Sequence, residues 1–139
     1  MIRPGSYLET EVMTASPHRL HLMVVDAALR HSRSAHAALE VGDRERAHLA
    51  LSKCRGLVAE MIGGLDGKHA PDSIERLKAL FVFVFQKCAE AETQRSSQLV
   101  ADALRVLEVH RETWLELGRL LIDKSANPAR LDSPHDWTT

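Results

Sequence analysis

The sequence lacks an excess of charge of either sign. Lysine and arginine together number 18, and aspartate and glutamate number 19. A chain with such balanced charge has no large net electrostatic field that would attract nucleic acid or an anionic membrane. The longest unbroken apolar run, residues 79–85, is far too short to cross a bilayer. We therefore expect no nucleic-acid partner and no insertion into a membrane.

Cysteine is scarce as well. Cys54 and Cys88 are far apart in the sequence and show none of the paired spacing of a zinc or redox motif, which fits a reducing compartment. The first residues, MIRPGSYLE, contain no apolar core of a signal peptide. These absences predict a cytoplasmic protein whose two thiols are unpaired, slow to react, and packed as small apolar groups.

Motifs for catalysis or metal binding are missing. The sequence has no Gly-rich phosphate loop, no nucleophile elbow and no Cys-x-x-Cys-His haem motif. Glu45 and His48 have the Glu-x-x-His spacing of di-iron bundles, but such a centre needs a second pair and two more inward carboxylates. His18 and His21 are three residues apart, yet no carboxylate or cysteine joins them. We therefore expect no enzyme, no metal and no other cofactor.

Two amphipathic helical segments fill the first half of the chain. Ser16 is a good N-cap, and Pro17 suits the first helical position, so a helix is predicted from there to about residue 41. Gly42 ends it and Asp43 caps the next helix, which Gly63-Gly64 interrupts. The apolar residues of both segments recur at three- and four-residue spacing, as amphipathic helices require.

Two further helices fill the second half. The third is predicted to start at Asp72, with Glu75 completing a capping box, and the fourth near Ser96 or Ser97. After Lys124 the sequence has no periodicity. Short connections between long helices make antiparallel neighbours. The predicted fold is therefore all-α: an antiparallel up-down four-helix bundle (16–124), with an extended N-terminal arm (1–15) and a flexible, disordered C-terminal tail (125–139).

The first and fourth helices are apolar over a wider arc than a bundle core needs. Their predicted core faces comprise Leu20, Val24, Ala27, Ala28, His31, Ala35 and Ala38 on the first, and Leu99, Ala103, Val106, Leu107, His110, Trp114, Leu117 and Leu121 on the fourth. His31 and His110 are expected to be hydrogen-bonded interior histidines. Surplus apolar residues lie beside these faces: Leu22, Val25 and Leu29 on the first helix, Leu104, Leu115 and Ile122 on the fourth, and Val82 and Phe83 on the third.

The surplus residues admit several interpretations. An extra apolar stripe often covers a neighbouring helix or a folded-back arm. It is also the feature that a partner segment needs for docking between helices. A self-associating structural bundle, or a bundle carrying a cofactor in its core, would be consistent with the same pattern.

Several stretches carry a family resemblance. In order along the chain they are Tyr7, Val12-Met13-Thr14-Ala15-Ser16-Pro17, Leu20-x-Leu22-Met23-x-x-Asp26-x-Ala28-Leu29, Gly42-Asp43, Leu80-Phe81-Val82-Phe83-Val84 and Arg111-Glu112-Thr113-Trp114. Together they resemble the flagellar export chaperone FliS family, over roughly residues 7–121. The chain departs from the family where Val25-Asp26-Ala27 replaces a frequent Tyr-Asp-Gly, and where Phe81 and Phe83 replace tyrosines. These departures bear on client preference.

The resemblance implies a cytosolic four-helix chaperone that binds the C-terminal segment of flagellin, prevents premature polymerisation and delivers its client to the secretion apparatus. It also implies export gate components as further candidate partners, with the chain itself a monomer or a weak homodimer. The arm is expected to fold over a groove until the client displaces it. The partner-binding residues predicted from the surplus stripes and the arm are Tyr7, Leu8, Val12, Leu22, Val25, Leu29, Val82, Phe83, Leu104, Leu115 and Ile122.

Overall fold

The structure is a computed structural model that describes residues 16–65 and 71–126. Within these ranges the chain forms four α-helices and no β-strand. The helices are α2 (Pro17–Glu40), α3 (Arg44–Gly63), α4 (Pro71–Gln94) and α5 (Ser97–Ala126). The all-α prediction is therefore confirmed. The predictions for Tyr7, Leu8, Val12 and the C-terminal tail beyond residue 126 lie outside the described residues.

Helix starts follow the capping residues read from the sequence. Ser16 Oγ accepts a hydrogen bond from the Arg19 amide at 3.2 Å, and Asp43 Oδ1 accepts one from the Arg46 amide at 3.1 Å. The Ser96 hydroxyl likewise accepts from the Leu99 amide at 3.3 Å. Each side chain satisfies one of the unpaired amides at a helix N-terminus.

Two predicted boundaries are wrong by one or two residues. The third helix begins at Pro71, so Asp72 lies in its first turn and is not the cap. Proline is favoured at the first helical position because its missing N–H would have had no partner there. The fourth helix continues to Ala126 rather than ending at Lys124.

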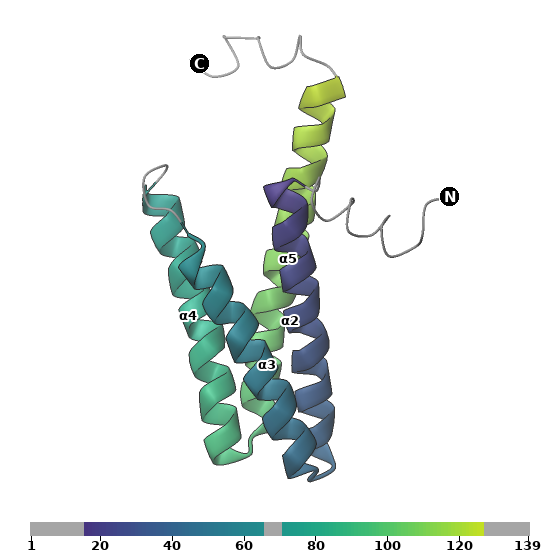
Figure 1. Cartoon of the computed structure of the whole chain (residues 1–139), viewed down its shortest axis with the longest axis vertical. Coiled ribbons are helices and arrows are strands. Elements are labelled where there is room, and N and C mark those ends of the chain that lie inside the picture. The colour runs from purple at the N-terminus through teal and green to yellow at the C-terminus, as the bar shows by residue number, and fades with distance from the viewer. Residues whose placement is uncertain (1–15, 66–70, 127–139) are drawn as a thin grey trace, which may run out of the picture.

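The helices form an antiparallel up-down bundle in which each packs against its neighbours in the order α2, α3, α4, α5 and back to α2 (Figure 1). The α2–α3 and α4–α5 connections lie at the same end of the bundle. Gly42 makes the first of these turns with φ +74°, a left-handed conformation that glycine adopts without steric cost. At the opposite end, α5 extends past the other three helices.

One continuous apolar core runs through the bundle. Its largest fully buried side chains include Phe81, Leu51 and Leu107. Alanines fill much of the remaining interface: Ala28, Ala35, Ala38, Ala47, Ala50, Ala91 and Ala103. Small side chains at these positions let the helix backbones approach closely.

Val25 and Leu29 correct the sequence-based assignment. They were expected beside the core, but they are 0% and 2% exposed and belong to the core cluster. Helix α2 packs against both α3 and α5, so the buried arc is wide enough to include them. Leu104 was also expected beside the core, and it is partly buried against it.

Three other residues are more exposed than the sequence predicted: Leu20, Leu117 and Leu121. All were expected on core faces, yet they are 38%, 40% and 46% exposed. Leu20 belongs to the first turn of α2, and Leu117 and Leu121 belong to the last third of α5, the helix whose end extends past the other three (Figure 1). A periodic apolar pattern predicts burial only where a partner helix is present along the whole stripe, and none of the four described helices covers these positions.

Candidate functional site: an apolar groove between α2 and α5

An open groove of about 1010 Å³ separates the start of α2 from the last third of α5. Its lining residues are Ser16, Pro17, His18, Arg19 and Leu22 from α2 and its cap, and Leu115, Gly118, Arg119, Leu121 and Ile122 from α5. Leu22, Leu115 and Ile122 were predicted as partner-binding residues from their positions beside the core. The structure brings these three together on one surface.

His18, which lines this groove, packs against Trp114 of α5. Their rings stack with centroids 4.9 Å apart and planes 5° from parallel. The Trp114 indole Nε1 also donates a hydrogen bond to the His18 carbonyl oxygen at 2.8 Å. These contacts fix the first turn of α2 against α5. The His18 side chain is partly buried at the groove.

Gly118 explains how His18 comes so close to α5. A Cβ at this position would lie 2.4 Å from His18 Nε2, far closer than two such atoms approach. Any residue larger than glycine would therefore push the ring away. Our sequence reading missed this position, although a lone glycine inside a strong helical pattern is a recognised sign of close packing.

A pair of histidines lies next to His18 and Trp114. His21 Nε2 and His110 Nε2 are 2.7 Å apart, so one ring donates and the other accepts. Both rings also contact the Phe81 and Trp114 rings. His110 is buried and hydrogen-bonded, as the sequence predicted, whereas His31 is only partly buried.

Burial keeps this histidine pair uncharged at neutral pH. Desolvation, followed by the nearby charge of His21, lowers the pKa of His110 to about 4. Desolvation, followed by the charge of His18, also lowers the pKa of His21 below its usual value. The aromatic cluster behind His18 is therefore uncharged at neutral pH.

An ion pair joins α2 to α5 nearer the middle of the bundle. Arg111 Nε donates to Asp26 Oδ1 at 2.5 Å. Both residues belong to stretches that carry the family resemblance. Their pairing adds a polar contact between the same two helices that form the groove.

Two predicted partner-binding residues lie apart from the groove. Val82 and Phe83 are exposed on α4 and do not line it. The Lys87 ammonium lies 5.3 Å from the centroid of the Phe83 ring, a cation–π distance. The structure thus leaves Val82 and Phe83 as a separate apolar patch.

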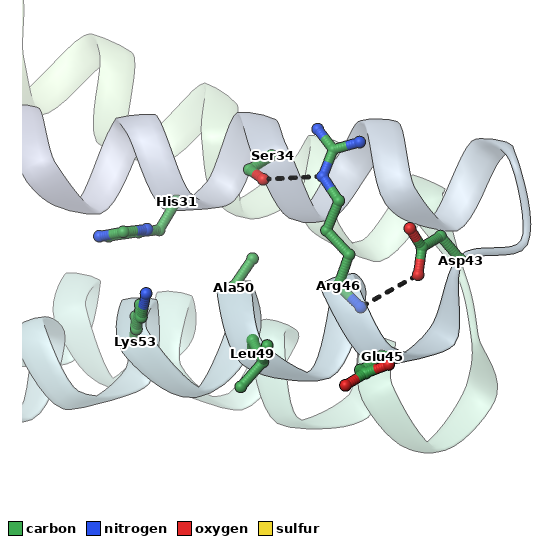
Figure 2. A pocket seen from close by; sticks show the side chains of 8 residues that line it. All are labelled: His31, Ser34, Asp43, Glu45, Arg46, Leu49, Ala50 and Lys53. Atoms are coloured by element: carbon green, nitrogen blue, oxygen red, sulfur yellow. Dashed lines mark hydrogen bonds between the residues drawn. The ribbon is translucent and has the colours of Figure 1, made fainter.

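A second hollow, of about 330 Å³, lies between α2 and α3 (Figure 2). It contains charged groups of both signs, including Lys53 and Glu45. Arg46 Nε donates to Ser34 Oγ across it at 3.3 Å. Desolvation, and then the charges of Lys53 and Arg30, lower the pKa of His31 at its edge. A small hollow of mixed charge does not suit an apolar partner segment.

No group of three or more metal-ligating side chains occurs within residues 16–65 and 71–126. Nor does any helix of the described part combine the length and apolarity needed to cross a membrane.

The fold and the groove define an all-α bundle with an open apolar surface between its first and last described helices. Residues 3–120 match the family model described as Flagellar protein FliS, so the chain belongs to the FliS family. This family consists of flagellar export chaperones and not of enzymes.

Two curated relatives agree with this assignment. The chain is 27% identical to the Flagellar secretion chaperone FliS of Salmonella typhimurium, over 80% of this chain and 83% of that protein. It is 22% identical to the Flagellar secretion chaperone FliSB of Pseudomonas aeruginosa, over 77% of this chain and 85% of that protein.

Proposed function

We propose that this protein acts in the cytoplasm and binds the C-terminal segment of flagellin, preventing its premature polymerisation and delivering it to the flagellar secretion apparatus. The groove between α2 and α5 is the proposed binding surface. The observation that carries this proposal is the open apolar lining of the groove, in which Leu22, Leu115 and Ile122 come together. The family membership supports the choice of a flagellar client.

The energetics favour an amphipathic client. Ile122 is 71% exposed, and Leu120 and Leu121 beside it are also exposed. Covering a large apolar side chain completely is worth about 1.5–3 kcal/mol. A disordered segment loses conformational entropy when it binds. Several such side chains covered together would offset that cost, and an amphipathic helix laid into a groove achieves this.

The N-terminal arm is the proposed occupant of the groove before the client arrives. The described chain begins at Ser16, which itself lines the groove, so the arm is joined to the rest of the chain at this surface. Tyr7, Leu8 and Val12 would supply the apolar contacts. Flagellin would then displace the arm. The export gate is a further candidate partner.

Binding of a flagellin C-terminal peptide to a pair of matched variants tests the groove. The double substitution Leu115→Asp, Ile122→Asp places two carboxylates in the groove and should weaken binding at least about 100-fold. The control is Val109→Asp, which alters an exposed apolar residue on the same helix that does not line the groove. It should bind like the unmodified protein.

Circular dichroism and melting curves must accompany the titration. If the double variant keeps its helicity and loses binding, the result supports the groove as the binding surface. If it keeps its helicity and binds the peptide with full affinity, the client binds elsewhere. The alternative function, a self-associating bundle, predicts that the unmodified protein forms a stable dimer by light scattering. It further predicts that the double variant becomes monomeric and that no peptide binds.

A further inference from the structure

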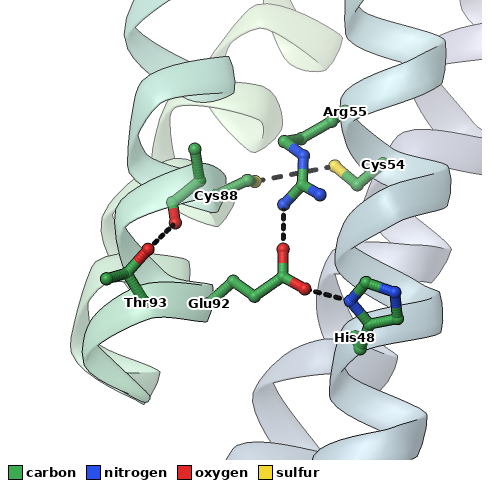
Figure 3. Close-up of polar contacts among 7 residues, drawn as sticks. His48, Cys54, Arg55, Cys88, Glu92 and Thr93 are labelled. Atoms are coloured by element: carbon green, nitrogen blue, oxygen red, sulfur yellow. Dashed lines mark hydrogen bonds and ion pairs between the residues drawn. The ribbon is translucent and has the colours of Figure 1, made fainter.

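Cys54 on α3 and Cys88 on α4 face each other inside the bundle (Figure 3). Their Sγ atoms are 3.8 Å apart, and both side chains are fully buried. Both are free thiols, as the sequence predicted. A disulfide holds its sulfurs at about 2.05 Å. The two sulfurs are already in van der Waals contact, so only a small movement is needed to bring them to bonding distance. The fold thus creates a dithiol that sequence spacing did not reveal.

Polar neighbours make the two thiols unequal. Cys88 donates a hydrogen bond to the Cys54 sulfur, and the Ser32 hydroxyl lies 3.1 Å from the same sulfur. The Cys88 hydrogen bond, with smaller contributions from Ser32 and Arg55, lowers the pKa of Cys54 in spite of its burial. The same hydrogen bond, together with burial, raises the pKa of Cys88. Cys54 is therefore the thiol that more readily forms a nucleophilic thiolate.

An ion-pair network holds α3 against α4 at the level of the thiols. Arg55, next to Cys54 in the chain, donates from Nη1 to Glu92 Oε2 at 2.6 Å (Figure 3). Glu92 lies one turn after Cys88, and its other carboxylate oxygen pairs with His48. The hydrogen bond from His48, followed by that from Arg55, lowers the pKa of Glu92. The Glu92 carboxylate is thus ionised. Its contacts with Arg55 and His48 hold α4 against α3, the two helices that carry the thiols.

We propose that Cys54 and Cys88 are a site of reversible oxidation by a peroxide, which converts the two thiols into an intrachain disulfide between α3 and α4. This site is independent of the flagellin-binding groove, because neither cysteine lines the groove. A small uncharged oxidant reaches a packed helix interface through transient local opening. Bulky thiol reagents do not, so slow labelling of the native thiols is compatible with this chemistry.

The reaction proceeds in two steps. The Cys54 sulfur attacks one oxygen of hydrogen peroxide and the O–O bond breaks. Cys54 becomes a sulfenic acid, and the other oxygen departs with the thiol proton as one molecule of water. The Cys88 sulfur then attacks the Cys54 sulfur, the S–S bond forms, the S–O bond breaks, and the hydroxyl leaves as a second water with the Cys88 proton. Two thiols are oxidised by two electrons and one peroxide is reduced to two waters. A dithiol reductant reverses the change.

The test treats the folded full-length protein with hydrogen peroxide, denatures it, alkylates the remaining thiols and measures the intact mass and a peptide map without reduction. The expected product has lost two hydrogens, takes up no alkylating agent, and yields one cross-linked peptide pair containing Cys54 and Cys88. Dithiothreitol should restore both alkylation sites. Cys88→Ser is the matched control, and it should give no intrachain cross-link.

The arrangement itself is tested by repeating the oxidation in denaturant. If the fold holds the two thiols together before oxidation, the folded protein gives mainly the intrachain disulfide. It then forms fewer interchain cross-links and fewer over-oxidised cysteines than the unfolded chain. Three results would overturn the proposal: two thiols that stay alkylatable after peroxide treatment of the folded protein, oxidation that stops at sulfinic or sulfonic acid, or cross-links found only between chains.

Discussion

The side chain of Trp114 holds both the backbone and the ring of His18: its indole N–H donates to the His18 carbonyl at 2.8 Å, and its face stacks on the imidazole. One residue of α5 therefore fixes the orientation of the first turn of α2. That turn supplies one wall of the groove, and Gly118 is what lets the stacked ring fit beside α5. The shape of the groove thus depends on a small number of contacts between two helices.

Gly118→Ala tests this dependence. The new methyl group would displace the His18 ring and distort the groove wall, so flagellin-peptide affinity should fall by about 10-fold or more. The better helix propensity of alanine is worth about 1 kcal/mol and should offset much of the cost in stability. Titration and urea unfolding of the same sample measure the two effects.

Gly56→Ala is the control for that substitution. An added Cβ at Gly56 meets nothing within 4 Å, and the residue lies inside α3, away from the groove. Its free energy of unfolding should rise by about 0.5–1 kcal/mol with unchanged peptide affinity. Equal affinities for the two alanine variants would show that the groove does not need the His18 position seen here.

The histidine pair predicts how stability depends on pH. The pKa values of His21 and His110 lie below the ordinary 6.5 in the folded protein. Between about 6.5 and 4 the unfolded chain therefore binds more protons than the folded protein does, so the free energy of unfolding falls as the pH is lowered. Urea unfolding at pH 7.5, 6.5 and 5.5 measures this, in a range above most carboxylate titrations.

Replacing both histidines with glutamine should flatten this pH dependence, because glutamine preserves a hydrogen bond without titrating. A double variant that loses stability between pH 7.5 and 5.5 as steeply as the unmodified protein would mean that other groups carry the effect. The uncharged pair should also make the melting temperature of the unmodified protein higher at pH 7.5 than at pH 5.5.

Leu29→Ala and Ile122→Ala test the corrected division between core and surface. Leu29 is 2% exposed, so truncating it should cost about 2–5 kcal/mol. Ile122 is largely exposed, and its truncation should change stability by no more than about 0.5 kcal/mol while weakening peptide binding. Similar losses of stability in the two variants would contradict this division.

Deleting residues 1–15 tests the proposed arm. If the arm competes for the groove, its removal abolishes that competition and should tighten flagellin-peptide binding several-fold. Adding the detached arm as a separate peptide should then reduce client binding again. An unchanged or weaker affinity after the deletion would exclude a competing arm.

The helices and most of the core could be predicted from sequence because their causes are local. Ser16, Asp43 and Ser96 cap the helices that follow them, and the apolar periodicity places Leu107 inside. Such signals need no knowledge of which helices touch. The up-down topology follows because the connections between the long helices are short.

The groove could be predicted only in part, because its limits depend on where neighbouring helices end. Leu22, Leu115 and Ile122 were identified from their positions beside the core, but the same reasoning placed Val25 and Leu29 there, and α3 and α5 cover both. It also placed Leu20 and Leu121 inside, although both are substantially exposed near the ends of their helices. The stacking of His18 on Trp114 and the contact between the two thiols join residues far apart in the chain, which no spacing rule connects.

The projecting end of α5 has a consequence for local stability. Leu107 is fully buried in the middle of the bundle, whereas Leu117, Leu120, Leu121 and Ile122 are all substantially exposed. Helical turns with few buried contacts open at a lower free energy than the core, and their amides exchange with solvent faster. Amide hydrogens after Leu117 should therefore exchange well before those near Leu107, and a bound client should slow them. The proposed binding surface would then belong to the part of the protein that changes shape most easily, and it could adapt to a client while the rest of the bundle stays folded.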